Sequence, residues 1–264
     1  FINLPGGSEV LSQSYRVPGA VHRLAETIVN RIHHRFPKKY NPRKEEGTVQ
    51  RISDIRAIDM SEGSWLVMAQ ANYMLTDLAS ELKSMGYLFE RNGARSISNS
   101  LSTAVNSWER VRKGGLIHVA SARIIYKYMS SNGARIKRGK KRIVGKDDDL
   151  LSFEMLVENH GLLATKDMPW FDAMDKIPLN DTLYITALLR RGEKFNAVPR
   201  IKLSTIHGTK GGEAENVVLI TDLTRAAMDT PGDDLHRVFY VGVTRTMENL
   251  FIMEPEDFSR AYIL

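Results

Sequence analysis

The sequence contains no cysteine among its 264 residues. Disulfide bonds, thiolate zinc sites and cysteine nucleophiles are therefore excluded. The seven histidines are scattered, and the adjacent pair His33 and His34 has a poor spacing for two ligands on one helix face. We therefore expect no structural metal. The lack of cysteine is also compatible with the reducing environment of the cytoplasm.

Long apolar runs are missing as well. No stretch is long enough to span a bilayer. The first residues carry no basic segment of the kind that opens a secretory signal. We therefore expect a cytoplasmic protein with no membrane partner. The sequence does not begin with methionine, and we interpret it as an excised fragment.

The sequence also lacks a phosphate-binding P-loop. Its nearest match to G-x-x-x-x-G-K-[ST] is segment 139–147, which has one residue too many between its glycines and an aspartate in place of the hydroxyl residue. A magnesium-binding carboxylate at a strand end is not evident either, since Asp222 is better interpreted as a turn residue after a strand. The chain by itself therefore lacks the usual cradle for a nucleoside triphosphate.

Positive charge is present in excess. The chain has 37 Lys and Arg against 31 Asp and Glu, a net charge of +6, which weakly favours an anionic partner such as a nucleic acid. One stretch concentrates basic residues with no acidic residue among them: Arg135, Lys137, Arg138, Lys140, Lys141, Arg142 and Lys146. Two interpretations stay open, a solvated loop and a salt-sensitive contact with duplex phosphates.

The periodicity of the first third predicts a parallel sheet with crossover helices. Helical spacing follows Pro18, and strands are expected at Thr48–Ile52, at Trp65–Ala69 and from Tyr87 onward. Between the last two strands, we expect Asn72 to cap a helix that Gly86 ends. A strand–helix–strand series of this kind is typical of an α/β fold.

From about residue 97, the apolar residues recur at helical spacing, and one of the expected helices is capped by Asp181. Strands return at 201–205, 217–220 and 250–253, and a helix is expected from Asp233 to about Thr246. The predicted domains are therefore a sheet domain formed by residues 1–96 and 197–264, and an inserted, mostly α-helical subdomain formed by residues 97–196.

The most informative segment is 204–213, which reads STIHGTKGGE and lies between two apolar strands. Small, polar and Gly-rich residues at a strand end allow backbone N–H groups to approach an anion. A second segment, 240–245 (YVGVTR), places an arginine at the end of an apolar helix, where it needs an anionic partner. A third, 11–16 (LSQSYR), precedes the first helix.

Together these segments resemble the C-terminal half of superfamily 1 helicases of the UvrD/Rep/PcrA type. Segment 11–16 resembles that family's motif IV, 65–72 its motif IVa, 205–213 its motif V and 240–245 its motif VI, in the family's order. The sequence departs from the family at Gly212 and Ala214, where leucine and an aromatic residue are usual, and at Gln70, which replaces a frequent arginine. The resemblance implies a RecA-like domain 2A and an inserted domain 2B.

The resemblance also implies site residues. Arg245 and Arg16 match the arginines that reach the γ-phosphate of ATP. Glu213 and Gly211 match residues at the nucleotide sugar, and Lys210 lies beside them. Single-stranded DNA is expected near Thr205, His207 and Asn72, and the 2B-like basic segment, including Arg138, Lys140 and Lys141, is expected to contact duplex DNA.

The sequence therefore predicts the C-terminal motor domain of an ATP-dependent DNA helicase that translocates 3′ to 5′, the direction resting on the resemblance alone. ATP with Mg²⁺ is the expected cofactor, with the Mg²⁺ ligands and P-loop supplied by an N-terminal RecA-like domain. The fragment alone is expected to be inactive. A non-catalytic nucleic-acid-binding scaffold and a subunit of a helicase–nuclease are the alternatives.

Overall fold

The computed structural model describes residues 12–36, 38–209, 211–229, 232–255 and 257–264. The chain divides into two compact units, of which the first comprises residues 1–94 and 199–264 and the second residues 95–198. The assignment of these units as helicase domains 2A and 2B stays a prediction. Among the described residues, no helix is both long enough and apolar enough to cross a bilayer.

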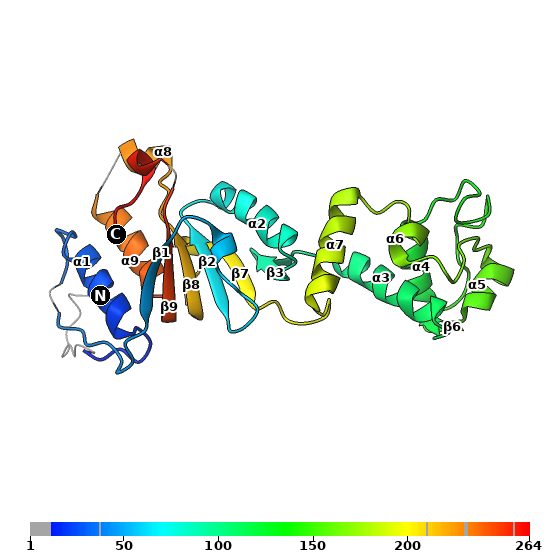
Figure 1. The fold of residues 1–264 in the computed structure, drawn as a ribbon, viewed down its shortest axis with the longest axis horizontal. Helices are drawn as coiled ribbons and strands as arrows, with labels where there is room; N and C mark the ends of the chain where they lie inside the picture. Colours follow the sequence, from blue (N-terminus) through cyan, green and yellow to red (C-terminus); the bar gives the residue numbers. More distant parts are fainter. Residues whose placement is uncertain (1–11, 37, 210, 230–231, 256) are drawn as a thin grey trace, which may run out of the picture. The chain divides into compact units, whose positions relative to one another are not determined.

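The first unit is built on a seven-stranded sheet with the order β1-β9-β8-β2-β7-β3-β4 (Figure 1). The strands are β1 (Thr48–Ile52), β2 (Trp65–Ala69), β3 (Phe89–Arg91), β4 (Ala94–Arg95), β7 (Ile201–Thr205), β8 (Ala214–Ile220) and β9 (Thr246–Met253). The pairings from β1 through β9, β8, β2 and β7 to β3 are all parallel. The predicted α/β class, a mostly parallel sheet flanked by helices, is confirmed.

Alternation along the central strands builds a core on each face of this sheet. Leu66 and Met68 of β2 pack into the core that contains α1 (Gly19–Val29) and α9 (Asp233–Val243). Trp65 and Val67 pack into the opposite core, which contains α2 (Leu75–Ser84). Because successive side chains of a strand point to opposite faces, a strand that is buried on both faces is apolar throughout.

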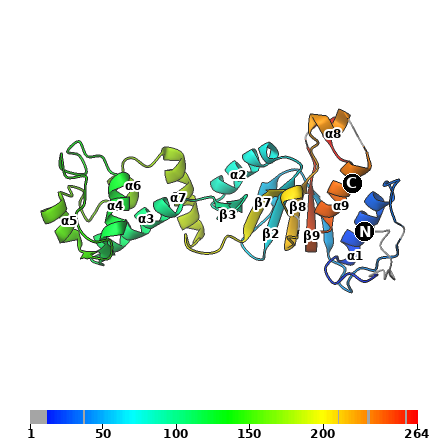
Figure 2. The same cartoon turned by 180° about the vertical axis from the view of Figure 1, so that it is seen from behind.

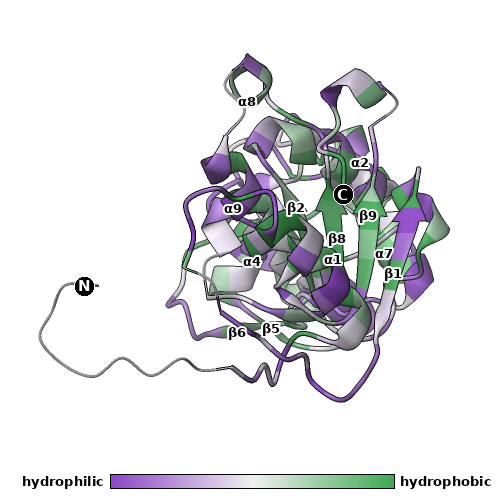
Figure 3. Ribbon diagram, turned by 90° about the vertical axis from the view of Figure 1, so that its left-hand side faces the viewer, coloured by the Kyte–Doolittle hydropathy of each residue, from purple (hydrophilic) through white to green (hydrophobic). Residues whose placement is uncertain are grey.

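Figure 2 shows α1 and α9 next to each other, apart from α2, and Figure 3 contrasts the hydrophobic central strand β8 with the more hydrophilic edge strand β1. The edge strand has only partial burial, as its composition TVQRI requires. The stop at Gly86 is confirmed, since its φ of 74° is the left-handed conformation that glycine tolerates.

The second unit contains five helices in its described residues, and a two-stranded antiparallel sheet. The helices are α3 (Asn99–Arg112), α4 (Val119–Lys127), α5 (Phe153–His160), α6 (Trp170–Ala173) and α7 (Leu179–Arg191), and the strands are β5 (Ile117–His118) and β6 (Leu150–Leu151). Trp108 and Tyr126 are among its largest buried side chains. Ser98 and Ser152 cap α3 and α5 by accepting hydrogen bonds from backbone N–H groups.

Two predicted helix caps are wrong. Asn72 lies inside the 3-10 helix η2 (Asn72–Met74), whose N-cap is Ala71. The Asn72 side-chain oxygen accepts a hydrogen bond from the Asn92 amide at 3.0 Å instead of a helix N–H. Asp181 falls in the first turn of α7, whose N-cap is Pro178. The sheet formed by β5 and β6 was not predicted, because strands of two residues leave no period in the sequence.

Candidate functional site

Segment 206–213 connects the carboxyl ends of the parallel strands with their amino ends. It leaves the carboxyl end of β7, where the Ile206 N–H donates to the Ala69 carbonyl at 2.9 Å, and ends at the amino end of β8. On the way it forms the 3-10 helix η3 (His207–Thr209). The buried Thr209 hydroxyl donates back to the Ile206 carbonyl at 2.7 Å, and the Gly212 N–H donates to the Thr209 carbonyl at 2.8 Å. The connection is therefore folded upon itself.

Two glycines allow this path. At Gly208 a Cβ atom would come within 2.5 Å of the Ser204 hydroxyl, so a larger residue forces a shift. Gly211 has a φ of 87°, which strains any residue with a side chain. Lys210, which the sequence assigns to the nucleotide, lies outside the described residues.

Arg245 lies in the turn between α9 and β9. The sequence places it on the helix, but α9 ends at Val243 and β9 already begins at Thr246. The turn is stabilised by the Thr244 hydroxyl, which donates to the Tyr240 carbonyl at 2.9 Å. Strands β8 and β9 pair in parallel from Ala214 and Thr246 onward. Arg245 and Glu213, which immediately precede these two residues, therefore lie at the same amino ends of the strands.

Arg16 reaches these amino ends from the other end of the chain. The buried Ser14 hydroxyl accepts hydrogen bonds from the N–H groups of Arg16 and Val17, at 3.2 and 2.9 Å, and so fixes the turn before α1. The Arg16 Nη1 then lies 3.3 Å from the Glu213 Oε2. Their side chains are 32% and 49% exposed, so solvent reaches this ion pair.

Arg245 converges on the same place. Its Nη1 donates to the Gly212 carbonyl at 3.2 Å. Burial lowers the pKa of Arg245, the positive charge of Arg16 lowers it further, and Glu213 opposes both effects. The Nε atoms of Arg16 and Arg245 are both buried, with no hydrogen-bond partner in the part of the chain that the structure describes. Two guanidinium groups and a single carboxylate leave a net positive charge here, which suits an anionic ligand.

The residues that the sequence assigns to single-stranded DNA lie at the carboxyl ends of the strands, opposite to the amino ends that carry the arginines. Ala69 and Thr205 are register partners at the carboxyl ends of β2 and β7. His207 and Asn72, which follow these ends, are both exposed. The Thr205 hydroxyl accepts from the Gly208 N–H at 3.1 Å. The structure therefore places these three residues near one strand-end surface, separate from the arginines.

The basic segment lies in the second unit and is mostly exposed. Arg138, Lys140 and Lys141 have no carboxylate partner among the residues that the structure describes, and Arg138 donates from its Nε to the Asn132 carbonyl at 3.1 Å. Buried Ile136 and Ile143 anchor the segment at either end. Its charge is therefore presented to solvent from a fixed loop.

Comparison with known proteins identifies a helicase family. Residues 149–256 match the family model of the UvrD-like helicase C-terminal domain. This match, which covers less than half of the chain, supports its interpretation as the C-terminal half of a UvrD-like helicase. Its function is therefore helicase-related, and the matched region contains Thr205, His207, Glu213 and Arg245. No curated protein matches the sequence.

The first unit also contains features that the sequence did not single out. Tyr15, the residue immediately before Arg16 in the chain, is 87% exposed, so its aromatic ring is largely uncovered. A cavity of about 500 Å³ adjoins the folded connection, with Gly208, Gly212, Glu213 and Lys202 among its lining residues. In the sequence, the only signal for Tyr15 is its place in segment 11–16, directly before Arg16. The cavity left no sequence signal, because it depends on pairings between strands that are distant in sequence.

Proposed function

We propose that this chain is the C-terminal motor domain of an ATP-dependent DNA helicase, acting on ATP that a P-loop-bearing RecA-like domain holds with Mg²⁺. In this proposal Arg16 and Arg245 reach the γ-phosphate. The observation that carries the proposal is their convergence on residues 212–213 at one sheet edge. Guanidinium groups that stabilise the charge developing during phosphoryl transfer contribute about 10³–10⁵ in rate.

The contacts of the two arginines suit exchange with a phosphate. The ion pair of Arg16 with Glu213 is partly exposed and rests on one 3.3 Å contact, and such a pair contributes at most about 1 kcal/mol. A phosphate that accepts from both guanidinium groups would replace it at little cost. Glu213 is then free to accept from a nucleotide sugar hydroxyl, and Gly211 leaves its neighbourhood open to the ligand.

We assign the single-stranded DNA to the carboxyl ends of β2 and β7. Thr205, His207 and Asn72 place hydroxyl, imidazole and amide groups there, which are types that contact phosphate and sugar. Because segment 206–213 begins beside these residues and ends at Glu213, a shift of the strand end can move the nucleotide contacts. This supports a motor that links DNA movement to hydrolysis.

We assign the second unit as domain 2B and its basic segment as a contact with duplex phosphates. Arg138, Lys140 and Lys141 have no carboxylate partner among the described residues, which supports this assignment, and such a contact is independent of base sequence. The proposed direction of translocation, 3′ to 5′, follows from the family alone.

The deciding experiment measures ATP hydrolysis with and without a P-loop domain. The 264-residue chain alone is expected to show no turnover above background, whereas the protein that joins it to a P-loop-bearing RecA-like domain is expected to hydrolyse ATP in a DNA-dependent manner. Arg245→Ala should then lower kcat by about 10³–10⁵. Arg245→Lys should recover only part of this, because lysine lacks the planar fork.

Two results would contradict the proposal. One is turnover by the isolated chain that disappears in Arg245→Ala, which would require a phosphate cradle within these residues. The other is an unchanged kcat for Arg245→Ala in the complete motor. That result would mean that Arg245 has only a structural role, and it would favour a non-catalytic binding scaffold.

A further inference from the structure

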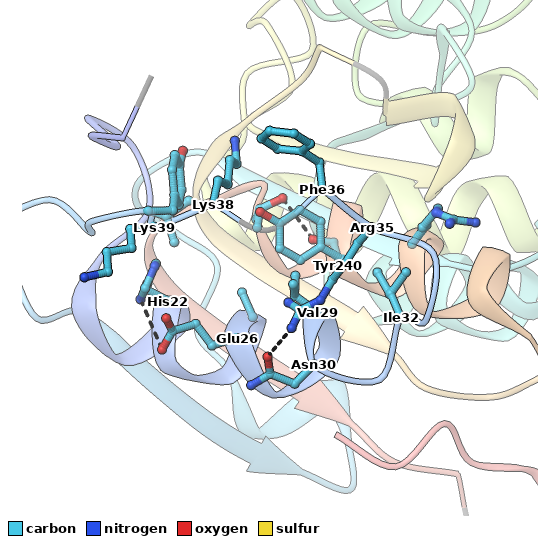
Figure 4. Close-up of a pocket in the computed structure, with 15 residues that line it drawn as sticks. His22, Glu26, Val29, Asn30, Ile32, Arg35, Phe36, Lys38, Lys39 and Tyr240 are labelled. Carbon is cyan, nitrogen blue, oxygen red and sulfur yellow. Dashed lines mark hydrogen bonds and ion pairs between the residues drawn. The ribbon is translucent and has the colours of Figure 1, made fainter. Parts of the chain in front are cut away.

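A second cavity of the first unit lies between α1, residues 32–36 and 38–40, and α9 (Figure 4). Its volume is about 580 Å³, within the range of about 300–1,000 Å³ that small-molecule sites occupy. The buried residues Val17, Ala25 and Ile32 form part of its apolar lining. The proposed motor function makes no use of this cavity.

Aromatic rings complete the apolar lining. Tyr240 comes from α9, Tyr40 stacks on His22 with ring centroids 5.9 Å apart, and Phe36 is 71% exposed at the rim. Figure 4 shows Phe36 and Tyr240 standing over the same space. A large exposed aromatic residue beside an apolar cavity is a surface that a ligand can cover with favourable burial.

The rim carries positive charge without a matching carboxylate. Arg35 donates to the Asn30 side-chain oxygen at 3.0 Å, and the Lys38 ammonium lies 4.9 Å from the centre of the Tyr40 ring. Neither of these residues, nor Lys39, has a carboxylate partner in the part of the chain that the structure describes. The acidic residue of the described lining, Glu26, lies 3.9 Å from His22 and not beside these cations.

We propose that this cavity binds a small organic anion with an aromatic or apolar body. The body would lie on Val17, Ile32 and the tyrosine rings, and the anionic group would lie at the rim, where Arg35, Lys38 and Lys39 make the surroundings positive (Figure 4). This charge complementarity decides the class of ligand, because a neutral ligand would gain nothing from the three cations and an inorganic anion would leave the apolar lining uncovered.

The cavity is separate from the proposed nucleotide site but shares a wall with it. Val17 and Thr244 line the cavity, and they are the chain neighbours of Arg16 and Arg245. Both guanidinium groups reach residues 212–213 outside it. A ligand in the cavity would therefore contact the chain neighbours of the two arginines, Val17 and Thr244, without occupying the phosphate position.

The test uses 1-anilinonaphthalene-8-sulfonate, an aromatic anion whose fluorescence rises in apolar surroundings, with the 264-residue chain. We expect saturable binding that Lys38→Glu/Lys39→Glu weakens at least about fivefold, because two attractive charges become repulsive. The control Lys127→Glu/Lys194→Glu makes the same change of net charge at exposed lysines of the second unit and should leave binding unchanged.

A second variant, Val29→Trp, is expected to fill the cavity and weaken binding, with circular dichroism checking that the fold is kept. Equal binding by the wild type and Lys38→Glu/Lys39→Glu would overturn the proposal. So would equal affinity for the neutral N-phenyl-1-naphthylamine, which would indicate a purely apolar docking groove. Displacement of the probe by ADP or by single-stranded oligothymidylate would also overturn it, because the cavity would then belong to the motor sites. If the probe binds as expected while Arg245→Ala leaves hydrolysis unchanged, only the motor proposal fails.

Discussion

Arg16 and Glu213 are 197 residues apart in the chain, yet their side chains meet at 3.3 Å. The contact exists because Ser14 fixes the turn before α1 and because segment 206–213 returns to the amino end of β8. Both partners stay accessible to solvent. An ion pair of this kind contributes little to stability, so its loss should change the free energy of unfolding only slightly.

Replacing Arg16 by alanine should separate catalysis from stability. In the complete motor we expect Arg16→Ala to lower kcat by about 10³-fold or more, while the free energy of unfolding changes by less than about 1 kcal/mol. Arg23→Ala is a matched control, because Arg23 forms an exposed ion pair with Glu46 in the same unit and faces no proposed ligand. Steady-state hydrolysis and urea unfolding of both variants measure the two effects. Equal kcat values for the two variants would remove Arg16 from the site.

Gly211 offers a test of the folded connection. A Cβ atom there meets no atom within 4 Å, so the cost of Gly211→Ala comes from its φ of 87°. We expect a loss of about 1–2 kcal/mol in unfolding free energy together with a raised KM for ATP in the complete motor. Gly114→Ala has the same type of strain, with a φ of 89° and open space, but lies in the second unit. It should cost similar stability and leave KM unchanged; a parallel rise of KM would mean that the effect is not local.

Buried apolar runs made the sheet predictable. Strand β2 could be identified because Trp65–Ala69 is apolar on both faces, and α2 because Leu75, Leu78 and Leu82 repeat at helical spacing. Prediction of helix caps from the local sequence failed where a residue distant in the chain binds the capping side chain. Asn72 was expected to cap a helix, but Asn92 takes its side-chain oxygen.

The candidate site could be predicted as a set of residues and not as a geometry. The motif order indicated Arg16, Glu213 and Arg245, but their meeting depends on the pairing of β8 with β9 and on the start of β9 at Thr246, four residues before the apolar run at Leu250. The cavity beside α1 left no motif at all, since its lining comes from a helix, an irregular segment and a second helix that are brought together by packing.

Stability should fall on mild acidification. The pKa of His236 is lowered by burial and by the positive charges of Arg31 and His33, against the opposing carboxylate of Asp233, and the pKa of His160 is lowered by burial and by Lys140. Below about pH 6.5 the unfolded chain therefore binds more protons than the folded chain. The unfolding free energy is expected to decrease from about pH 7.5 to about pH 5.5, above the range in which most carboxylates titrate.

The double variant His236→Gln/His160→Gln should flatten this dependence, as measured by urea unfolding at the two pH values. His34→Gln serves as the control, because its ring is exposed. A wild-type stability that rises on acidification, or a slope that the double variant leaves unchanged, would show that these two histidines are not the groups responsible.

The basic segment makes the most quantitative prediction. If Lys137, Lys140 and Lys141 bind duplex phosphates, replacing all three by glutamine should weaken duplex binding and reduce the steepness of log K against log salt by up to about 0.9 for each phosphate that is no longer neutralised. Binding titrations at several salt concentrations measure the slope directly. Replacing Lys113, Lys127 and Lys194 by glutamine removes the same charge elsewhere in the second unit. If both triple variants weaken binding equally with no change of slope, the loss reflects net charge alone, and the segment is solvated surface.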